Sequence, residues 1–538
     1  MRKKLRRPPR NALISAVTLA AVVFCGLAPS HAEMVWRRGA LGDPNSIDPH
    51  KTTNVIESNV LSELFEGLVS HDARGAIVPG VAQSWTASPD GTVYTFQLRS
   101  DAKWSNGDSV GPQDFVYAFR RLMTPATGAP YANIYYTLKN AEKINKGEAP
   151  VESLGVHAIS DSALEITLET PAPYFIDELA LMTAMPLHRG SVESYGSDFV
   201  RAAHMVTNGP FMLKDFTPND RLVLVRNPYY YDAARVALDA EIFIPIEDRS
   251  AALRRFMAGE IDSYDDVAAE QLAFARARFP EALRTAPSLA GYYYGFDTRH
   301  GPFDDRRVRQ ALSMAVDREF LAERIWRGRM TPAYSFVPPG IASYDPPATV
   351  SWKDMSPFER EDEAKRLLRE AGFGEGGRKL EVEIRFSNSE THRATAVAIA
   401  DMWKALGVET TLLGTDAVSY YAFLREKGQF DVVRLVWIAD YPDAQDFLFL
   451  AQSDNKGLNY PSFSNETYDA LMRAAQMEPS PERRRGILHE AESLLLDEQP
   501  YLVLMNYRSS DLVSPRLRGW EPNALDLHYG RYISIAPE

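Results

Sequence analysis

The stretch FDVVRLVWIADYPDAQD, residues 430–446, decides the fold class and contains the first candidate site. It opens as a run of β-branched and aromatic residues, which predicts a buried strand. Arg434 interrupts that run, and Asp440 stands where the strand gives way to an Asp-Tyr-Pro-Asp turn. Because side chains alternate along a strand, these two charges project to one face, about 20 Å apart at roughly 3.3 Å per residue.

An acid and a base at that separation cannot pair with each other. They suit instead the two ends of a short extended ligand with an ammonium at one end and a carboxylate at the other, which is the chemistry of a peptide. A purely structural interpretation also exists, because an Asp before Tyr-Pro-Asp is common in turns and at helix starts. The stretch alone leaves both interpretations open.

The first 32 residues have the pattern of a secretory signal peptide. Basic residues within 2–10 precede an apolar, acid-free run over 11–27, and Ser30-His31-Ala32 supplies a small-x-small cleavage pattern. We expect cleavage after Ala32 and a periplasmic mature protein. A membrane anchor is the alternative, but the run is short for a span of about 20 residues.

The mature chain is acidic and free of cysteine. Six of the 59 basic residues and none of the 72 acidic ones lie in the first 32, so 53 basic residues face 72 acidic ones, a net charge of −19. That excess argues against binding nucleic acid or an anionic membrane through bulk electrostatics. Since Cys25 is the only cysteine, the mature chain has no disulfide, thiolate metal site or cysteine nucleophile.

Strand and helix patterns alternate through the rest of the chain. Strands are expected at residues 34–39, 92–99, 221–226, 241–245, 292–296, 379–386, 408–413 and 501–505, and helices at 249–259, 306–326, 357–371 and 391–406. The strand-helix-strand order over 379–413 predicts an α/β lobe with a crossover connection. The glycine-rich run 372–377 follows a helix and precedes a strand, so it is interpreted as a turn and not as a phosphate loop.

Several motifs recur in a fixed order along the mature chain. They are Ser46-x-Asp48-Pro49-His50, Phe65-Glu66-Gly67-Leu68, Pro79-Gly80-Val81-Ala82-x-Ser84-Trp85, DAKWSNGD at 101–108 with DFVYAF at 114–119, Val206-Thr207-Asn208-Gly209-Pro210-Phe211, Asn227-Pro228-x-Tyr230-Tyr231, Gly259-Glu260-Ile261-Asp262, and Pro302-Phe303-Asp304-Asp305-x-Arg307-Val308-Arg309-Gln310-Ala311-Leu312. With them the chain resembles the extracytoplasmic solute-binding proteins of peptide ABC importers, and most of all the periplasmic oligopeptide-binding proteins.

The resemblance implies a bilobal α/β fold of the large periplasmic peptide-binding type, with three domains and hinged lobes that close over ligand. The expected parts are lobe I (33–68, 190–289 and 508–538), an additional domain II (69–189) and lobe II, or domain III (290–507). The implied function is capture of short oligopeptides for the permease and ATPase subunits of an importer. We expect a monomer that is not an enzyme and uses neither a cofactor nor a metal.

The resemblance also assigns candidate ligand-binding residues. In the family, the aspartate matching Asp440 binds the peptide ammonium, while Arg434 belongs to the basic set facing the peptide carboxylate, and Trp437 lies between them. Strand addition suits a peptide backbone of any sequence, so we expect an edge at Val436, Trp437 and Ile438, with Thr53, Asn54 and Val55 opposite. The remaining candidates are His392, Arg425, Tyr131, Tyr293 and Tyr294.

This chain departs from the best-known members at four positions. Ala290 and Ile438 stand where those proteins have a cysteine pair, and Gly295 and Thr53 replace two acids. These changes leave the preferred peptide length open.

Three alternatives remain. The first is a same-family binder of a murein peptide, glutathione, nickel or haem; the ten histidines are scattered, with no pair at ligand spacing. The second is a secreted hydrolase, for which GxSxG, HExxH and a cysteine nucleophile are all missing from the mature sequence. The third is a binding module with a chaperone or sensory role.

Overall fold

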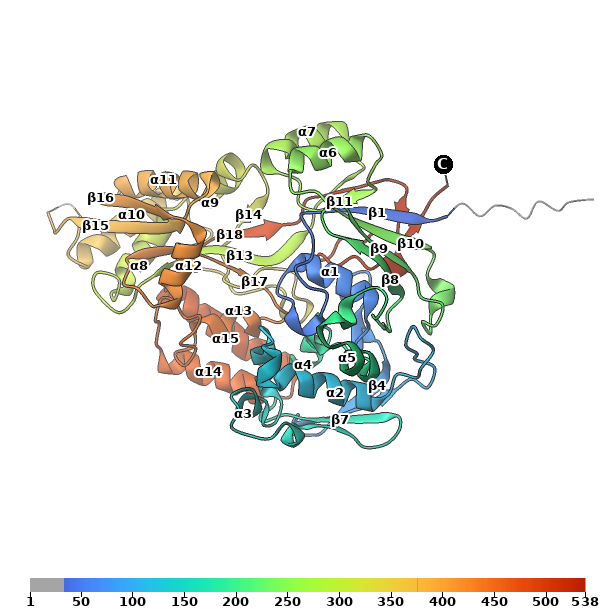
Figure 1. The fold of residues 1–538 in the computed structure, drawn as a ribbon. Helices are drawn as coiled ribbons and strands as arrows, with labels where there is room; N and C mark the ends of the chain where they lie inside the picture. The colour runs from blue at the N-terminus through green and yellow to red at the C-terminus, as the bar shows by residue number, and fades with distance from the viewer. Residues whose placement is uncertain (1–32, 375, 538) are drawn as a thin grey trace, which may run out of the picture. The chain divides into compact units, whose positions relative to one another are not determined.

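Three β-sheets organise residues 33–374 and 376–537, which are the residues that the computed structural model describes (Figure 1). The predicted signal peptide lies outside this range. Seven strands form one sheet in the order β12-β19-β11-β1-β10-β9-β8, and six form another in the order β14-β18-β13-β17-β15-β16. A third sheet has the order β4-β5-β7-β6.

The seven-stranded sheet gathers segments from both ends of the chain. Its strands are β1 (Val35–Ala40), β8 (Phe211–Thr217), β9 (Arg221–Arg226), β10 (Ala240–Pro245), β11 (Ser263–Tyr264), β12 (Leu283–Arg284) and β19 (Asp511–Val513). β1 pairs in parallel with β10 and with β11, whereas β19 runs antiparallel to β11 and β12. This part of the fold is therefore discontinuous in sequence.

The six-stranded sheet contains the stretch that opened the sequence analysis. Its strands are β13 (Pro287–Phe296), β14 (Met330–Pro332), β15 (Leu380–Ser387), β16 (Val408–Thr415), β17 (Val432–Ile438) and β18 (Tyr501–Arg508). β15 pairs in parallel with β16 across helix α11 (Glu390–Lys404), so the predicted crossover is confirmed.

The remaining strands belong to the small sheets. They are β4 (Ala82–Ala87), β5 (Val93–Leu98), β6 (Val156–Ala158) and β7 (Ala163–Thr167), with the pairs β2 (Val69–His71)/β3 (Ile77–Pro79) and β20 (Leu517–Arg518)/β21 (Ser534–Ile535). The other α-helices are α1 (Val55–Leu64), α2 (Pro112–Met123), α3 (Ala141–Asn145), α4 (Phe175–Glu178), α5 (Arg189–Tyr195), α6 (Arg249–Met257), α7 (Leu272–Arg278), α8 (Arg306–Met314), α9 (Arg318–Phe320), α10 (Pro357–Glu370), α12 (Ala417–Arg425), α13 (Gln445–Leu448), α14 (Glu466–Met477) and α15 (Pro481–Glu498).

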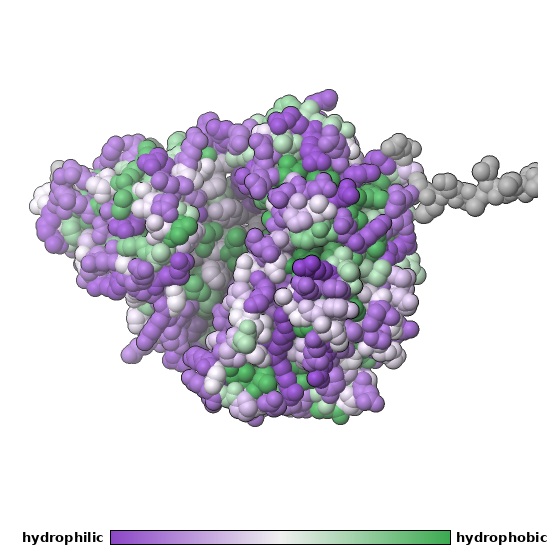
Figure 2. Space-filling view, viewed as in Figure 1, coloured by the Kyte–Doolittle hydropathy of each residue, from purple (hydrophilic) through white to green (hydrophobic). Residues whose placement is uncertain are grey.

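Two large hydrophobic cores lie in the compact unit Met34–Glu538. One surrounds the six-stranded sheet, and the other joins the seven- and four-stranded sheets. On the face drawn in Figure 2, polar residues cover most of the surface and apolar residues show inside a recess near its centre. The predicted α/β class is confirmed, while the boundaries of the three domains stay a prediction.

One predicted helix is wrong in its extent. The segment 306–326 is not continuous, because α8 ends at Met314 and a new helical turn begins at Arg318. Asp317 causes the new start: its Oδ1 accepts a hydrogen bond from Phe320 N at 2.8 Å, which is N-cap geometry. Residues 321–325 then continue as a π-helix.

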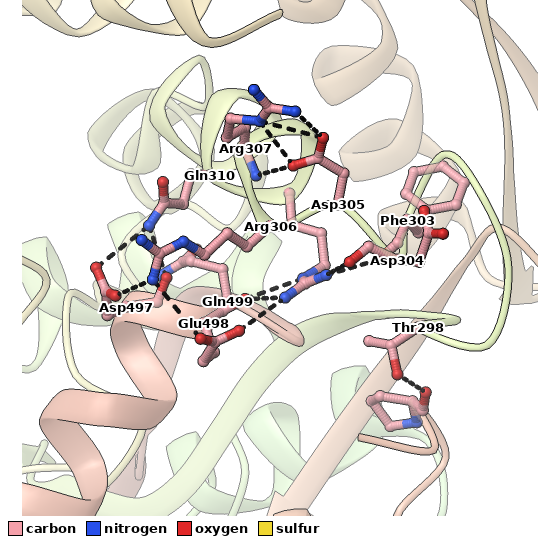
Figure 3. A network of polar contacts seen from close by, with 12 residues as sticks. Thr298, Phe303, Asp304, Asp305, Arg306, Arg307, Gln310, Asp497, Glu498 and Gln499 are labelled. Carbon is pink, nitrogen blue, oxygen red and sulfur yellow. Dashed lines mark hydrogen bonds and ion pairs between the residues drawn. The ribbon is translucent and has the colours of Figure 1, made fainter. Parts of the chain in front are cut away.

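The family motif at 302–312 has a structural role (Figure 3). Asp305 caps α8, and Arg309 from the first turns of that helix is 3% exposed. Its Nη1 donates to Phe303 O at 2.7 Å and its Nε to Glu498 O at 2.9 Å. The motif therefore joins the start of α8 to the end of α15.

Candidate functional site

Strand β17 has one open edge. β13 pairs with β17 along its whole length, with Ala290 opposite Ile438, but β15 pairs only with Val432 and Val433. Ala439 N donates to Leu289 O at 2.8 Å, and backbone groups of an antiparallel strand alternate in direction. The backbone groups of Val436 and Ile438 therefore point away from β13, as the predicted edge requires.

The segment opposite that edge is a helix cap and not a strand. Asn54 is the N-cap of α1, and Val55 is already the first residue of the helix. The carboxylate of Glu57, itself 1% exposed, accepts from Thr53 N at 2.7 Å and Asn54 N at 3.2 Å. That Thr53, Asn54 and Val55 face a bound peptide stays a prediction; Glu57 already takes the N–H groups of the first two.

A cavity of about 260 Å³ lies between this cap and the end of β17. Its lining includes six of the predicted residues, Thr53, Asn54, Val55, Tyr131, Ile438 and Asp440. The other lining residues are Ser58, Ser62, His71, Asp177, Ala180, Leu181, Met182, Met185, Ala439, Tyr441, Pro442, Leu525, Leu527 and Tyr529.

Asp440 presents a carboxylate to this cavity without a cationic partner among the described residues. Burial raises the pKa of Asp440 to about 6. A second acid, Asp446, lies behind it and is 1% exposed. Its Oδ2 accepts from Trp437 Nε1 at 3.0 Å and from Asp440 N at 3.1 Å, so Trp437 holds the acid pair in place.

Burial, followed by the charge of Asp440, raises the pKa of Asp446 well above its usual value. Burial is the first cause of both shifts, because a poorly solvated site disfavours an ionised carboxyl. A cation that entered the cavity would relieve that cost.

Asp177 is a second acid in the cavity wall, and the sequence did not single it out. Burial, followed by the charge of Asp443, raises the pKa of Asp177 to about 7. Arg484 lies near but is engaged by Asp443, with Nη–Oδ distances of 2.7 and 2.8 Å. His71 in the same wall stays neutral, because burial and Arg531 lower its pKa to about 4. The lining therefore contains two acids and no charged base.

Arg434 forms a separate polar cluster near the start of β17. Its Nη2 donates to His392 Nε2 at 2.9 Å and its Nη1 to Tyr421 OH at 3.2 Å. The hydroxyl of Tyr292 lies 3.2 Å from His392 Nδ1, and the guanidinium lies 5.3 Å from the Tyr292 ring centre. Burial and the charge of Arg434 lower the pKa of His392 to about 4, so the imidazole is neutral.

No described carboxylate pairs with Arg434, which is 6% exposed and whose Nε has no hydrogen-bond partner in that part of the chain. A nearly buried guanidinium without a counter-ion is costly, and an incoming carboxylate would supply one.

The other three predicted residues lie elsewhere. Tyr293 and Tyr294 are buried in the core, at 4% and 0% exposure, and do not line this cavity. The core packed on the sheet explains their burial, since Tyr293 contacts Phe336 and Tyr501. It is Tyr292 whose hydroxyl reaches the arginine cluster, and a ligand contact of Tyr293 or Tyr294 stays a prediction. Arg425 ends α12 as an exposed residue.

One group of described residues has the composition of a metal site. Asp511, Asp526 and His528 each bring a ligand atom within 4.8 Å of the others. The sequence pattern did not indicate this group, because Asp511 lies in another segment than Asp526 and His528 and the group includes a single histidine.

No helix in the described part of the chain is both long enough and apolar enough to cross a lipid bilayer.

Residues 76–459 match the model of the bacterial extracellular solute-binding proteins, family 5 Middle. The chain is 35% identical to the periplasmic murein peptide-binding protein MppA of Escherichia coli over 529 residues, 97% of each chain. It is 35% identical over 520 residues to the periplasmic oligopeptide-binding protein OppA of Salmonella typhimurium, covering 95% of this chain and 94% of OppA.

Solved structures agree with these sequence matches. The unliganded open form of MppA superimposes with a TM-score of 0.85 at 35% identity, covering 94% of this chain and 97% of MppA. OppA of Haemophilus influenzae in complex with the peptide RPPGFSPFR gives 0.76 at 32% identity, covering 94% of this chain and 99% of OppA. The expected bilobal periplasmic-binding fold is confirmed.

Proposed function

Because this chain belongs to the bacterial extracellular solute-binding proteins of family 5, we propose that it captures short oligopeptides outside the cytoplasm and delivers them to an ABC importer. The observation that carries the proposal is the charge pattern of β17. An acid-lined cavity lies at its C-terminal end, an arginine without a counter-ion lies nearer its start, and an open backbone edge lies between them.

Asp440 receives the peptide ammonium in this proposal. An ammonium taken out of water needs a carboxylate to replace its hydration. Asp440 has no competing cation among the described residues, and Asp446 fixes its backbone from behind by accepting a hydrogen bond from Asp440 N at 3.1 Å. Tyr131 and Asn54 complete the polar wall around the ammonium.

The backbone of the peptide pairs with the edge at Val436 and Ile438. Main-chain pairing does not depend on side chains, so it tolerates many sequences. The N–H groups of Thr53 and Asn54 are occupied by Glu57. The carbonyl of Asn54 accepts from Ser58 N at 3.1 Å and its Oδ1 from Glu57 N at 3.0 Å, so the peptide backbone pairs with β17 and not with this cap.

Arg434 binds the peptide carboxylate, and His392 and Tyr421 orient its guanidinium. Arg425, exposed at the end of α12, takes the carboxylate of longer peptides.

A murein peptide is the second candidate cargo. MppA, at 35% identity, is named for such a peptide. The second acid in the cavity, Asp177, favours ligands that carry a positive charge besides the N-terminal ammonium.

The setting follows from the same proposal. The chain is exported by the signal peptide, cleaved after Ala32, and works in the periplasm as a monomer with membrane permease and ATPase subunits. We assign lobe I to the seven-stranded sheet, domain II to the four-stranded sheet and lobe II to the six-stranded sheet. Binding and release, without catalysis, complete its cycle.

Native mass spectrometry tests the proposal on mature protein purified from an exporting host without refolding. A series of bound masses that match peptides of two to five residues would support a general oligopeptide binder. A single discrete mass would support the murein-peptide alternative or another specialised cargo. A protein that arrives empty and takes up no peptide on titration would refute the proposal.

A further inference from the structure

Asp511, Asp526 and His528 form a cluster where the chain passes from one sheet to another. β18 ends at Arg508 in the six-stranded sheet, and β19 begins at Asp511 in the seven-stranded sheet. One ligand atom from each member of the cluster lies within 4.8 Å of the other two. The C-terminal segment thus reaches the crossing between sheets.

The side chain of Asp511 gives a second observation, independent of the distances, that points to a ligand. Its side chain belongs to a residue that is 2% exposed, and its Oδ1 is buried without a hydrogen-bond partner in the part of the chain that the structure describes. Buried carboxylate oxygens are costly unless a donor or a cation satisfies them. This oxygen belongs to the carboxylate that faces Asp526 and His528.

The nearby arginines are engaged elsewhere. Arg38 lies 3.8 Å from Glu63 and 3.6 Å from Glu241, both 0% exposed. Arg329 pairs with Asp266. Over residues 33–374 and 376–537, no arginine or lysine forms an ion pair with Asp511 or Asp526. The negative charge of the cluster is therefore open to an external cation.

His528 is already oriented for coordination. Its Nε2 lies 3.2 Å from Asp526 Oδ1, and its ring stacks on Trp520 with centroids 3.6 Å apart. One imidazole nitrogen with two carboxylates is a donor set that suits zinc-like ions, whereas Mg²⁺ and Ca²⁺ prefer oxygen ligands alone.

We propose that Asp511, Asp526 and His528 bind one divalent transition-metal ion of the Zn²⁺ type, with water completing the coordination. A cavity of about 440 Å³ whose lining includes Asp265, Asp511 and Asp526 gives the ion a route from solvent. The ion supplies the missing partner of Asp511 and links the C-terminal segment to β19.

The site shares a wall with the smaller cavity. Leu525, Leu527 and Tyr529 line the cavity that contains Asp440, and Asp526 and His528 alternate with them along the same segment. An ion that holds Asp526 and His528 in place therefore also holds the residues that alternate with them and line that cavity. This last step rests on the proposed function: if peptides bind there, ion and peptide must change each other's affinity by the same factor.

Isothermal titration of chelator-treated mature protein with Zn²⁺, without peptide, tests the site. We expect one equivalent to bind to the wild type and the stoichiometric site to disappear in His528→Gln and in Asp511→Asn. His188→Gln is the matched control, because His188 lies 3.1 Å from Asp108 in a histidine–aspartate pair with an exposed acid. That variant should bind Zn²⁺ as the wild type does.

A spectroscopic readout follows the same site in the intact protein. Cu²⁺ bound at His528 should quench the fluorescence of the stacked Trp520, and Trp520→Phe should remove that component of the quenching. Where either His528→Gln or Asp511→Asn does not fold, the melting temperature replaces it as the readout. A rise in the melting temperature of the wild type on addition of Zn²⁺, with an equal rise for His188→Gln, then supports the site.

The proposal is overturned if the wild type shows no stoichiometric Zn²⁺ binding, or if folded His528→Gln binds Zn²⁺ as the wild type does. Its failure is distinguishable from failure of the proposed function. A protein that binds peptides but no Zn²⁺ refutes this site alone, and one that binds Zn²⁺ but no peptide refutes the peptide proposal alone.

Discussion

Replacing Asp440 with asparagine removes one negative charge and leaves the shape of the cavity nearly unchanged. In the proposed complex this charge is the direct partner of the peptide ammonium. Removing one partner of a buried ion pair costs about 3–5 kcal/mol. Because Asp440 is partly exposed in the empty protein, we expect the lower end, about 3 kcal/mol, which is about 100-fold in Kd.

Isothermal titration with a free tripeptide and with its N-acetylated form measures this effect. Asp440→Asn should weaken binding of the free peptide by about 100-fold, and it should change binding of the acetylated peptide far less, because that ligand has no ammonium. Asp232→Asn serves as the control, since Asp232 lines a different cavity, with Tyr230 and Tyr231. Equal losses for both peptides in Asp440→Asn would refute the assignment of the ammonium.

The pH dependence gives a second test of the same residue. Burial raises the pKa of Asp440 to about 6 in the empty protein, and the ammonium needs the ionised form. Between pH 7 and pH 5 the ionised fraction falls about tenfold, so peptide affinity should weaken about tenfold. The stability of the empty protein should change in the opposite direction. Because folding raises the pKa of Asp440 to about 6, its neutral form stabilises the folded protein at low pH, and this contribution is lost as the pH rises through about 6. Both trends should flatten in Asp440→Asn.

Other substitutions test the rest of the site and the fold. Arg434→Met should lower the affinity for tripeptides by about 10- to 100-fold, because a charge-assisted pair is lost, and it should lower the affinity for pentapeptides less. Isothermal titration measures both, and equal losses at every length would contradict the carboxylate role. Asp177→Asn should reduce affinity for peptides with a basic first residue more than for alanine peptides, and an unchanged ratio of the two affinities would argue against a second cationic subsite. Arg309→Met should lower the free energy of unfolding by about 2–4 kcal/mol, because it leaves buried carbonyls unpaired; Arg306→Ala, at an exposed position of the same helix, is the control in thermal denaturation.

Much of the fold was predictable because its elements are strongly patterned. β15, α11 and β16 lie within two residues of their predicted limits, since apolar periodicity and clear stop residues mark them. The break within 306–326 was missed because the apolar pattern continues across it. Only the capping hydrogen bond of Asp317, which competes with helix continuation, reveals the new start.

The charged candidates of the proposed site could be named from the sequence. Asp440 and Arg434 stand out because an acid and a base interrupt an apolar run. Asp177 was missed although it also stands in a short apolar segment, Phe-Ile-Asp-Glu-Leu. Its place in the cavity wall depends on α4 and the end of β17 meeting there, and the sequence pattern does not show which segments meet.

The burial of Tyr293 and Tyr294 shows what the sequence pattern lacks. Three consecutive tyrosines establish a strand but not its register, and a shift of one residue exchanges its two faces. The register is set by the pairing of Tyr292 with Val436, together with the contacts of β18 on the other side. Because the arginine cluster needs the hydroxyl of Tyr292 against His392, the same pairing that buries Tyr293 also positions Arg434. The core and the carboxylate end of the proposed site therefore depend on one register, and a substitution that shifts it should damage both.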